Sequence, residues 1–245
     1  MTTALQDLDA IIAQLEKDTS TSSSNAGGAQ KQKGDVVAAG EGGKKKEKKA
    51  KAPKAPKAPK APKGAVADPN QPSITKIEFK VGVIKRAWKH ETADKLYCEE
   101  INVGEPEGPR QIASGLVPHY TLAQMNPEGG RRVVVMANLK AKNLVGFKSH
   151  GMVCCAAKAT ADGAEAVEFV EPPAGASPGT ILTFDGLTGD YKPVTAAQVD
   201  KKKVLVDALP DFVVNGAGEV EWKGAKFGCA EGVVTAPTLR DCVVR

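Results

Sequence analysis

At about Ser73 the chain changes from long polar stretches to alternating apolar and polar residues. Short apolar runs with a period of two, separated by turn residues, are typical of β-strands. The pattern predicts strands at 77–90, 96–104, 111–116, 131–140 and 149–158, with a short helix at 117–125. Three strands, a helix and two strands is the order of an OB-fold barrel, here expected over residues 73–157.

Residues 158–245 continue with short apolar runs between glycine-containing turn steps. This pattern predicts a second, β-rich unit. Its expected strands are ILTF at 181–184, KVLVDAL at 203–209, EVEW at 219–222 and CVVR at 242–245. The pattern does not define the topology of this unit.

The first seventeen residues carry a helical period. Leu5, Leu8, Ile12 and Leu15 are spaced by 3, 4 and 3 residues, which places them on one face of a short amphipathic helix within residues 1–17. A helix of this length is marginal alone in water. The apolar stripe therefore favours a docking helix for a protein partner, and the alternative is a frayed segment that packs on nothing.

Residues 18–72 have few side chains to bury and are expected to form a disordered linker rich in Lys, Ala and Pro. The unit Ala-Pro-Lys repeats four times, and its prolines favour an extended, polyproline-like chain. Such a cationic strip can follow phosphates without reading bases. The expected nonspecific RNA contacts are Lys45, Lys48, Lys51, Lys54, Lys57, Lys60 and Lys63. A solvated spacer and a nuclear-localisation signal are the alternatives.

Charge is distributed unevenly between the two β-rich units. Residues 73–157 hold twelve basic and eight acidic residues, a net +4, whereas residues 158–245 hold nine basic and thirteen acidic residues, a net −4. A basic unit beside an acidic one suggests that the first meets a polyanion.

The five cysteines form no Cys-x-x-Cys pair, which argues against a disulfide framework and a zinc site. We expect buried, reduced thiols in a reducing compartment, the cytoplasm, with no metal and no cofactor. Asp7 and Asp9 stand where a signal peptide would be basic, and no apolar run is long enough for a membrane span.

Enzyme motifs are missing from the sequence. The three histidines have no neighbouring His or Cys at metal-ligand spacing, and neither a phosphate-binding P-loop nor a G-x-S-x-G motif is present. The expected class is therefore a binding protein rather than an enzyme.

Polar residues cluster around the first, fourth and fifth expected strands. Lysine and arginine supply phosphate contacts, and asparagine and serine can reach ribose or base edges. The candidate RNA contacts are Lys85, Arg86, Lys89, Asn138, Lys140, Lys142, Lys148 and Ser149, with His90, Asn143 and His150 beside them. Among the aromatic residues, we expect only Trp88 and Phe147 outside the core. Few exposed aromatics favour recognition of folded RNA by shape.

Three runs of the sequence resemble the EMAP II-like tRNA-binding domain. They are H-x-x-A-D-x-L-Y from His90, SGLV from Ser114, and NLK at 138–140. The S-x-G-M set of Ser149, Gly151 and Met152 belongs to the same resemblance and adds Met152 to the candidate contacts. The P-P-x-G-x-x-P-G block after Glu171 is similar to the EMAP II-specific extension. Relatives more often carry a further basic residue near Val145.

The resemblance implies an OB barrel that binds tRNA by shape, without choosing among tRNAs. It also implies that residues 158–245 pack on the barrel where bacterial relatives place a second subunit, giving a monomeric pseudo-dimer. Such domains occur in auxiliary proteins of eukaryotic synthetase complexes and at the ends of some tyrosyl- and methionyl-tRNA synthetases. The expected function is a non-enzymatic tRNA-binding cofactor that presents tRNA to one or more aminoacyl-tRNA synthetases. A scaffold that assembles synthetases and a processed, cytokine-like fragment are the alternatives.

Overall fold

The computed structural model describes residues 70–187 and 192–245. Two predicted features lie outside the described residues and stay predictions. They are the helix at 1–17 and nearly all of the linker at 18–72, including its lysine-rich segment at 44–63, which we call the lysine strip. Within the described ranges, no helix combines the length and the apolar character that crossing a membrane would require.

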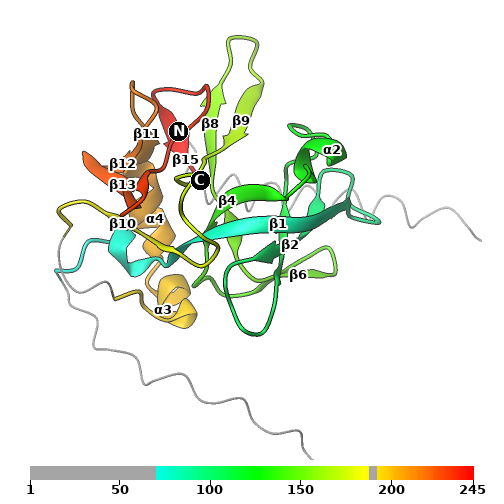
Figure 1. Ribbon diagram of the computed structural model, residues 1–245, viewed down its shortest axis with the longest axis horizontal. Helices are drawn as coiled ribbons and strands as arrows, with labels where there is room; N and C mark the ends of the chain where they lie inside the picture. The colour runs from blue at the N-terminus through cyan, green and yellow to red at the C-terminus, as the bar shows by residue number, and fades with distance from the viewer. Residues whose placement is uncertain (1–69, 188–191) are drawn as a thin grey trace, which may run out of the picture.

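The first half of the described chain is an antiparallel barrel whose central strand is β1 (Figure 1). After the short helix η1 (Ile74–Lys76), the barrel strands are β1 (Phe79–Lys89), β2 (Tyr97–Asn102), β3 (Arg110–Ser114), β4 (Arg131–Met136) and β7 (Met152–Val153). β1 pairs with β2 on one side and with β4 on the other, and β4 pairs with β7. β3 lies against β7, which completes the circuit. The OB-fold order predicted from the alternating pattern is confirmed.

Helix α2 (Leu122–Met125) covers one end of the barrel. Thr121 and Gln124 form a capping box at its start. Met125 is fully buried, and the Asn126 side chain accepts from the Ala87 amide at 2.6 Å and donates to the Ala87 carbonyl at 2.9 Å. The sequence predicted a helix of nine residues here, and only its last turn is helical.

The second half extends the same sheet, because β10 pairs with the start of β1. Its strands are β8 (Cys155–Ala159), β9 (Glu165–Phe169), β10 (Ile181–Phe184), β11 (Phe212–Val214), β12 (Val220–Trp222), β13 (Ala225–Cys229), β14 (Gly232–Val233) and β15 (Cys242–Val244). Its helices are α3 (Ala196–Lys201), α4 (Val204–Ala208) and η2 (Leu209–Asp211). β8 runs across the expected boundary at 157/158 and pairs with β9 and β15.

A hydrophobic cluster joins the two halves, and we call it the shared core. The Phe79 ring of β1 meets the rings of Phe184, Phe212 and Phe227 at centroid distances of 5.9, 5.5 and 5.0 Å. All four rings are buried, and such aromatic contacts add to the free energy of burial. The extension therefore packs on the barrel, as the resemblance implied.

The backbones of the halves also approach closely at Gly104 and Gly179. A Cβ on Gly104 would stand 2.7 Å from the Gly179 Cα, and both residues have positive φ angles, of 74° and 90°. The Gly179 amide donates to the Val81 carbonyl at 2.8 Å. Only glycine fits this combination of φ and contact.

The expected strand at 203–209 is wrong, because Val204–Ala208 forms helix α4. Val204 and Ala208 are four residues apart and are both buried, so they lie on one face of a helix. The expected strands at 181–184, 219–222 and 242–245 are confirmed within two residues.

The cysteines of the described chain are free thiols. Four of them are buried, and Cys229 is partly exposed. Burial raises the pKa of Cys98 to about 11 and raises the pKa of Cys155 well above its ordinary value. These thiols therefore stay protonated and behave as small apolar core groups.

Candidate nucleic-acid interface

The far half of β1 presents Lys85, Arg86 and Lys89 to solvent, and all three side chains are exposed. The register between β1 and β2 shifts between Ile84 and Arg86, which marks a β-bulge. A bulge re-aims side chains, so two consecutive basic residues, Lys85 and Arg86, both face outward. We call Lys85, Arg86 and Lys89 the basic strip.

Two half-buried aromatic residues link the basic strip to the next basic segment. The Trp88 ring meets the Phe147 ring edge-on, at a centroid distance of 6.1 Å and an angle of 78°. The Arg86 guanidinium lies over the Trp88 ring, 4.9 Å from its centroid. Trp88 and Phe147, expected outside the core, therefore lie partly at the surface and hold β1 against the following hairpin.

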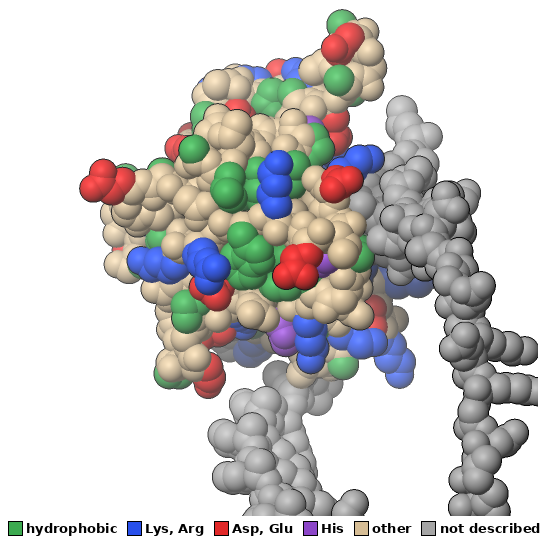
Figure 2. Space-filling model, turned by 90° about the vertical axis from the view of Figure 1, so that its right-hand side faces the viewer, with side chains coloured by type: hydrophobic (Ala, Val, Ile, Leu, Met, Phe, Trp, Pro, Cys, Tyr) green, Lys and Arg blue, Asp and Glu red, His purple; other side chains and the backbone are tan. Residues whose placement is uncertain are grey.

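That hairpin consists of β5 (Lys142–Leu144) and β6 (Phe147–Ser149), which the sequence pattern did not predict as strands. Its turn places Val145 and Gly146 at φ angles of 49° and 90°. Leu144 and Val145 pack against the β1–β2 loop. Lys142 and Lys148 are exposed on this hairpin, which contacts the strand of the basic strip through Phe147 and Trp88. From the side of the barrel, Lys and Arg side chains gather along the lower edge of the surface, with a histidine among them (Figure 2).

Ser149 does not belong to the exposed surface, because only 4% of it is accessible to solvent. Its Oγ accepts from the Ala113 amide and donates to the Gly151 carbonyl, both at 3.1 Å. The neighbouring His150 amide donates to the Gln111 carbonyl at 2.8 Å. Ser149 therefore fastens β6 to β3, and its hydroxyl serves the closure of the barrel.

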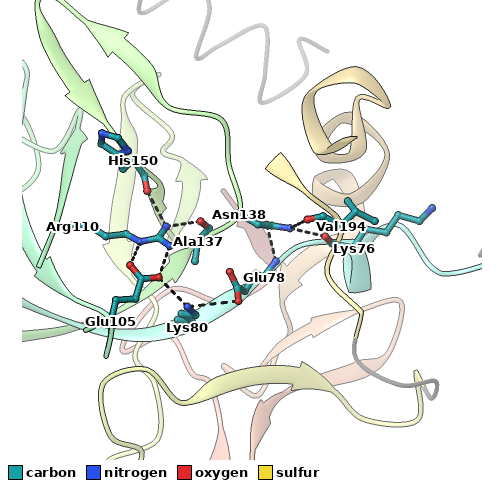
Figure 3. A network of polar contacts seen from close by, with 9 residues as sticks. All are labelled: Lys76, Glu78, Lys80, Glu105, Arg110, Ala137, Asn138, His150 and Val194. Atoms are coloured by element: carbon teal, nitrogen blue, oxygen red, sulfur yellow. Dashed lines mark hydrogen bonds and ion pairs between the residues drawn. The ribbon is translucent and has the colours of Figure 1, made fainter. Parts of the chain in front are cut away.

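Asn138 is also turned inward, toward the joint between barrel and extension (Figure 3). Its Oδ1 accepts from the Glu78 amide at 2.8 Å. Its Nδ2 donates to the carbonyls of Lys76 and Val194, at 2.9 and 2.8 Å. Both N–H donors are thus used within the protein, so the expected contact of this amide with RNA is a poor fit to the structure.

A charged network positions the segments on either side of Asn138 (Figure 3). The Arg110 guanidinium forms two bonds to the Glu105 carboxylate, at 2.5 and 2.6 Å, and donates to the carbonyls of Ala137 and His150. Lys80 pairs with Glu105 at 3.1 Å. The hydrogen bond from Arg110 holds the pKa of Glu105 below its ordinary value. The sequence gives no local signal for this role of Arg110. It shows only an arginine beside the expected strand at 111–116.

Lys140 and Met152 lie between the barrel and the extension. Lys140 is exposed, and its Nζ pairs with Asp200 of α3 at 3.1 Å. Met152 is half-buried against the shared core. Of the predicted RNA contacts, Lys142 and Lys148 thus lie on the hairpin that contacts the strand of the basic strip, and Lys140 and Met152 lie at the joint.

Replacing Asn138 by alanine is expected to lower the free energy of unfolding by about 2–3 kcal/mol, because three hydrogen bonds disappear and a backbone amide and two carbonyls are left without their partner. Urea denaturation measures this difference. Asn143→Ala, an exposed position on β5, is the matched control and should change the stability little. Equal stability of the two variants would show that Asn138 does not hold the joint.

Comparison with known proteins points to one family. The family described as "Putative tRNA binding domain" matches residues 79–181. The aminoacyl tRNA synthase complex-interacting multifunctional protein 1 of Mus musculus is 35% identical over 182 residues, which cover 74% of this chain and 55% of that protein. The tRNA-aminoacylation cofactor arc1 of Schizosaccharomyces pombe is 39% identical over 145 residues, 59% of this chain and 30% of that protein. The matches thus span about half or less of these curated relatives.

The fold is shared with a solved structure over nearly the whole of that domain. The crystal structure of the C-terminal domain of Plasmodium vivax p43 is 33% identical, with a TM-score of 0.63. The match covers 70% of this chain and 98% of that one. Barrel and extension therefore occur together in this relative as well.

Proposed function

Because the chain belongs to the family of EMAP II-like tRNA-binding-domain proteins, we propose that it binds tRNA through the basic strip and the β5–β6 hairpin. The observation that carries the proposal is the contact of Trp88, on the strand of the basic strip, with Phe147, on the hairpin that carries the exposed Lys142 and Lys148. Lysine and arginine contacts of this kind position a nucleic-acid backbone without specifying its sequence. We infer recognition of tRNA by its shape and its phosphates.

The scarcity of exposed aromatic residues supports recognition of folded RNA. Trp88 and Phe147 are half-buried and are engaged with each other. Nonspecific single-strand binders instead stack successive bases on exposed rings. The interface that we propose is therefore suited to a helical, folded RNA, whose grooves and backbone are recognised by shape.

We propose a non-enzymatic role, in which the chain presents bound tRNA to aminoacyl-tRNA synthetases in the cytoplasm. The name of the fission yeast relative, a tRNA-aminoacylation cofactor, supports this role. The name of the mouse relative refers to a synthetase complex and favours a second candidate function, the assembly of synthetases. Under that proposal Leu5, Leu8, Ile12 and Leu15, which lie outside the described residues, would contact a synthetase.

The packing of the extension on the barrel supports a monomer, the pseudo-dimer that the resemblance implied. One interface of the barrel is already covered by residues of the same chain. Sedimentation of the full chain across a range of concentrations tests this proposal, and a concentration-dependent dimer would contradict it.

Crosslinking of the full chain to tRNA, followed by peptide mapping, tests the proposed function. We expect crosslinked peptides that contain Lys85–Lys89 and the hairpin segment 142–149. If crosslinks appear only in the linker peptides at 44–63, the barrel is not the RNA-binding surface. If the full chain shows no affinity for tRNA, the proposed function itself is wrong.

The lysine strip is expected to raise the affinity for tRNA by acting on the same polyanion as the barrel. Replacing the ten lysines of segment 44–63 by glutamine keeps the tether length and removes its charge. We expect tRNA binding to weaken about tenfold or more, with a flatter dependence of log K on log salt concentration. Filter binding at several salt concentrations measures both quantities. An unchanged slope would show that the strip does not touch the RNA.

A further inference from the structure

A hollow of about 390 Å³ lies between the barrel and the extension. Its barrel side is formed by Leu139, Leu144 and Met152, and its extension side by Val199, Leu205 and Val206. These apolar side chains come from segments more than 40 residues apart in the sequence. The hollow lies between helices α3 and α4 on one side and the β5–β6 hairpin on the other, because their side chains do not fill this space.

Charged side chains surround this apolar lining. Lys140 and Lys142 contribute from the barrel, and Lys203 contributes from the extension. Asp200 is the acidic residue of the lining, and it pairs with Lys140 at 3.1 Å. Lys203 is exposed and lies between α3 and α4 with a φ angle of 50°. Three lysines against one carboxylate give the lining a net positive charge, which complements a phosphate.

The hollow adjoins the surface that the proposed function assigns to tRNA. Lys142 belongs to both, because it lies on β5 of the basic hairpin. An RNA strand that passes over Lys148 and Lys142 therefore arrives at the hollow. The size of the hollow is near the lower end of ligand sites in proteins, which begin at about 300 Å³. That is room for one nucleotide and too little for a helical stem.

We propose that the hollow receives one unstacked nucleotide of the bound tRNA, with the base on the apolar lining and its phosphate beside Lys142 and Lys203. This inference rests on the proposed function. Unstacked bases of RNA loops and ends are commonly bound in this way, and bases taken out of a stack are held between apolar or aromatic side chains. The Asp200 carboxylate can accept a hydrogen bond from an amino group of the base.

The inference gives the extension a direct part in RNA binding. Residues 158–245 have a net charge of −4, and the charge pattern of the sequence assigned the contact with a polyanion to residues 73–157. In the structure Lys203 lines the same hollow as Lys140 and Lys142. The extension then completes an RNA site that the barrel alone would leave open on one side.

Val206→Phe tests the occupancy of the hollow, because it fills the space without changing the charge. We expect tRNA binding about tenfold weaker, with the slope of log K against log salt unchanged, since every phosphate-binding lysine is retained. Val213→Phe is the matched control, a half-buried valine on β11 that does not line the hollow. The control should bind tRNA as the wild-type chain does.

Lys203→Gln and Lys202→Gln form a second matched pair. Both remove one positive charge from adjacent exposed positions, but only Lys203 lines the hollow. We expect Lys203→Gln to lower the magnitude of the salt slope by about one and to weaken binding severalfold. Lys202→Gln should show only a small, long-range effect. Equal effects of the two changes would contradict a local phosphate contact.

A titration of the wild-type full chain with AMP and CMP provides a readout that does not depend on the variants folding. The methyl resonance of Met152 should shift with either nucleotide, and tRNA should reverse the shift by competition. A Met152 resonance that does not respond, together with normal tRNA binding by Val206→Phe, would overturn the inference and leave the proposed function intact. If removal of residues 1–17 shifts the Met152 resonance, the occupant is this chain's own N-terminal segment and the inference is wrong.

Discussion

Combining Lys85→Ala, Arg86→Ala and Lys89→Ala is expected to weaken tRNA binding about 100-fold at physiological salt, because three cations that pair with phosphates are removed. The three side chains are exposed on one strand, so their removal leaves the barrel core unchanged. We also expect the slope of log K against log salt to fall in magnitude by about 2–3, because that many phosphates are no longer neutralised by the protein.

A triple variant on the extension controls for the change in net charge. Lys158→Ala, Lys223→Ala and Lys226→Ala remove the same charge from exposed positions away from the hairpin. The ion pairs of Lys223 and Lys226 lie at the surface, and such pairs contribute little to stability. If both triple variants show the same decrease in affinity and in slope, tRNA responds to overall charge and the basic strip is not its contact surface.

The barrel could be predicted from the sequence because its strands are short apolar runs separated by turn residues. Val81, Val83 and Ala87 of β1 are buried, as the pattern required. The same rule failed at 203–209, where the apolar run of Val204, Leu205 and Val206 is also compatible with a helix. A short apolar run does not separate these two cases, and packing against the shared core determined the outcome.

The exposure of the candidate basic side chains could be predicted, and the inward orientation of the polar side chains could not. A lysine such as Lys85 stays at the surface because burying its charge is costly. Asn138 and Ser149 instead satisfy backbone groups of other strands. The Glu78 amide bonded to Asn138 is 60 residues away in the chain, and no local pattern reports such a partner. The β5–β6 hairpin was missed because its turn is Val145-Gly146 rather than Asn-Gly.

Glu99→Gln is expected to stabilise the protein at neutral pH. Glu99 lies on β2, has no solvent exposure and accepts one hydrogen bond, from the Ser114 hydroxyl. Within the described residues its Oε2 has no hydrogen-bond partner. Burial raises the pKa of this carboxyl to about 8, and the hydrogen bond from Ser114 opposes the rise only in part. The folded protein therefore holds the proton up to a higher pH than the unfolded chain, whose carboxyl titrates near 4.5.

Between pH 4.5 and 8 the native state binds more protons than the unfolded state, so the contribution of Glu99 to stability is complete below pH 4.5 and is lost as the pH rises toward 8. The slope is at most about 1.4 kcal/mol per pH unit, which makes the loss about 3 kcal/mol at pH 7. Glutamine resembles the protonated carboxyl in shape and charge. The variant should therefore match the wild-type stability at pH 4 and exceed it by about 3 kcal/mol at pH 7.

Urea denaturation of both proteins from pH 4 to 8 measures this difference directly. Glu100→Gln is the matched control, since Glu100 is the next residue on the same strand and is only half-buried. We expect Glu100→Gln to follow the wild-type curve, while Glu99→Gln is flatter with pH. If the stability of Glu99→Gln falls with pH as steeply as that of the wild-type chain, Glu99 is charged in the folded barrel at neutral pH. Because β2 pairs with the strand that carries the basic strip, a flatter curve would also extend the pH range over which that strip keeps its geometry.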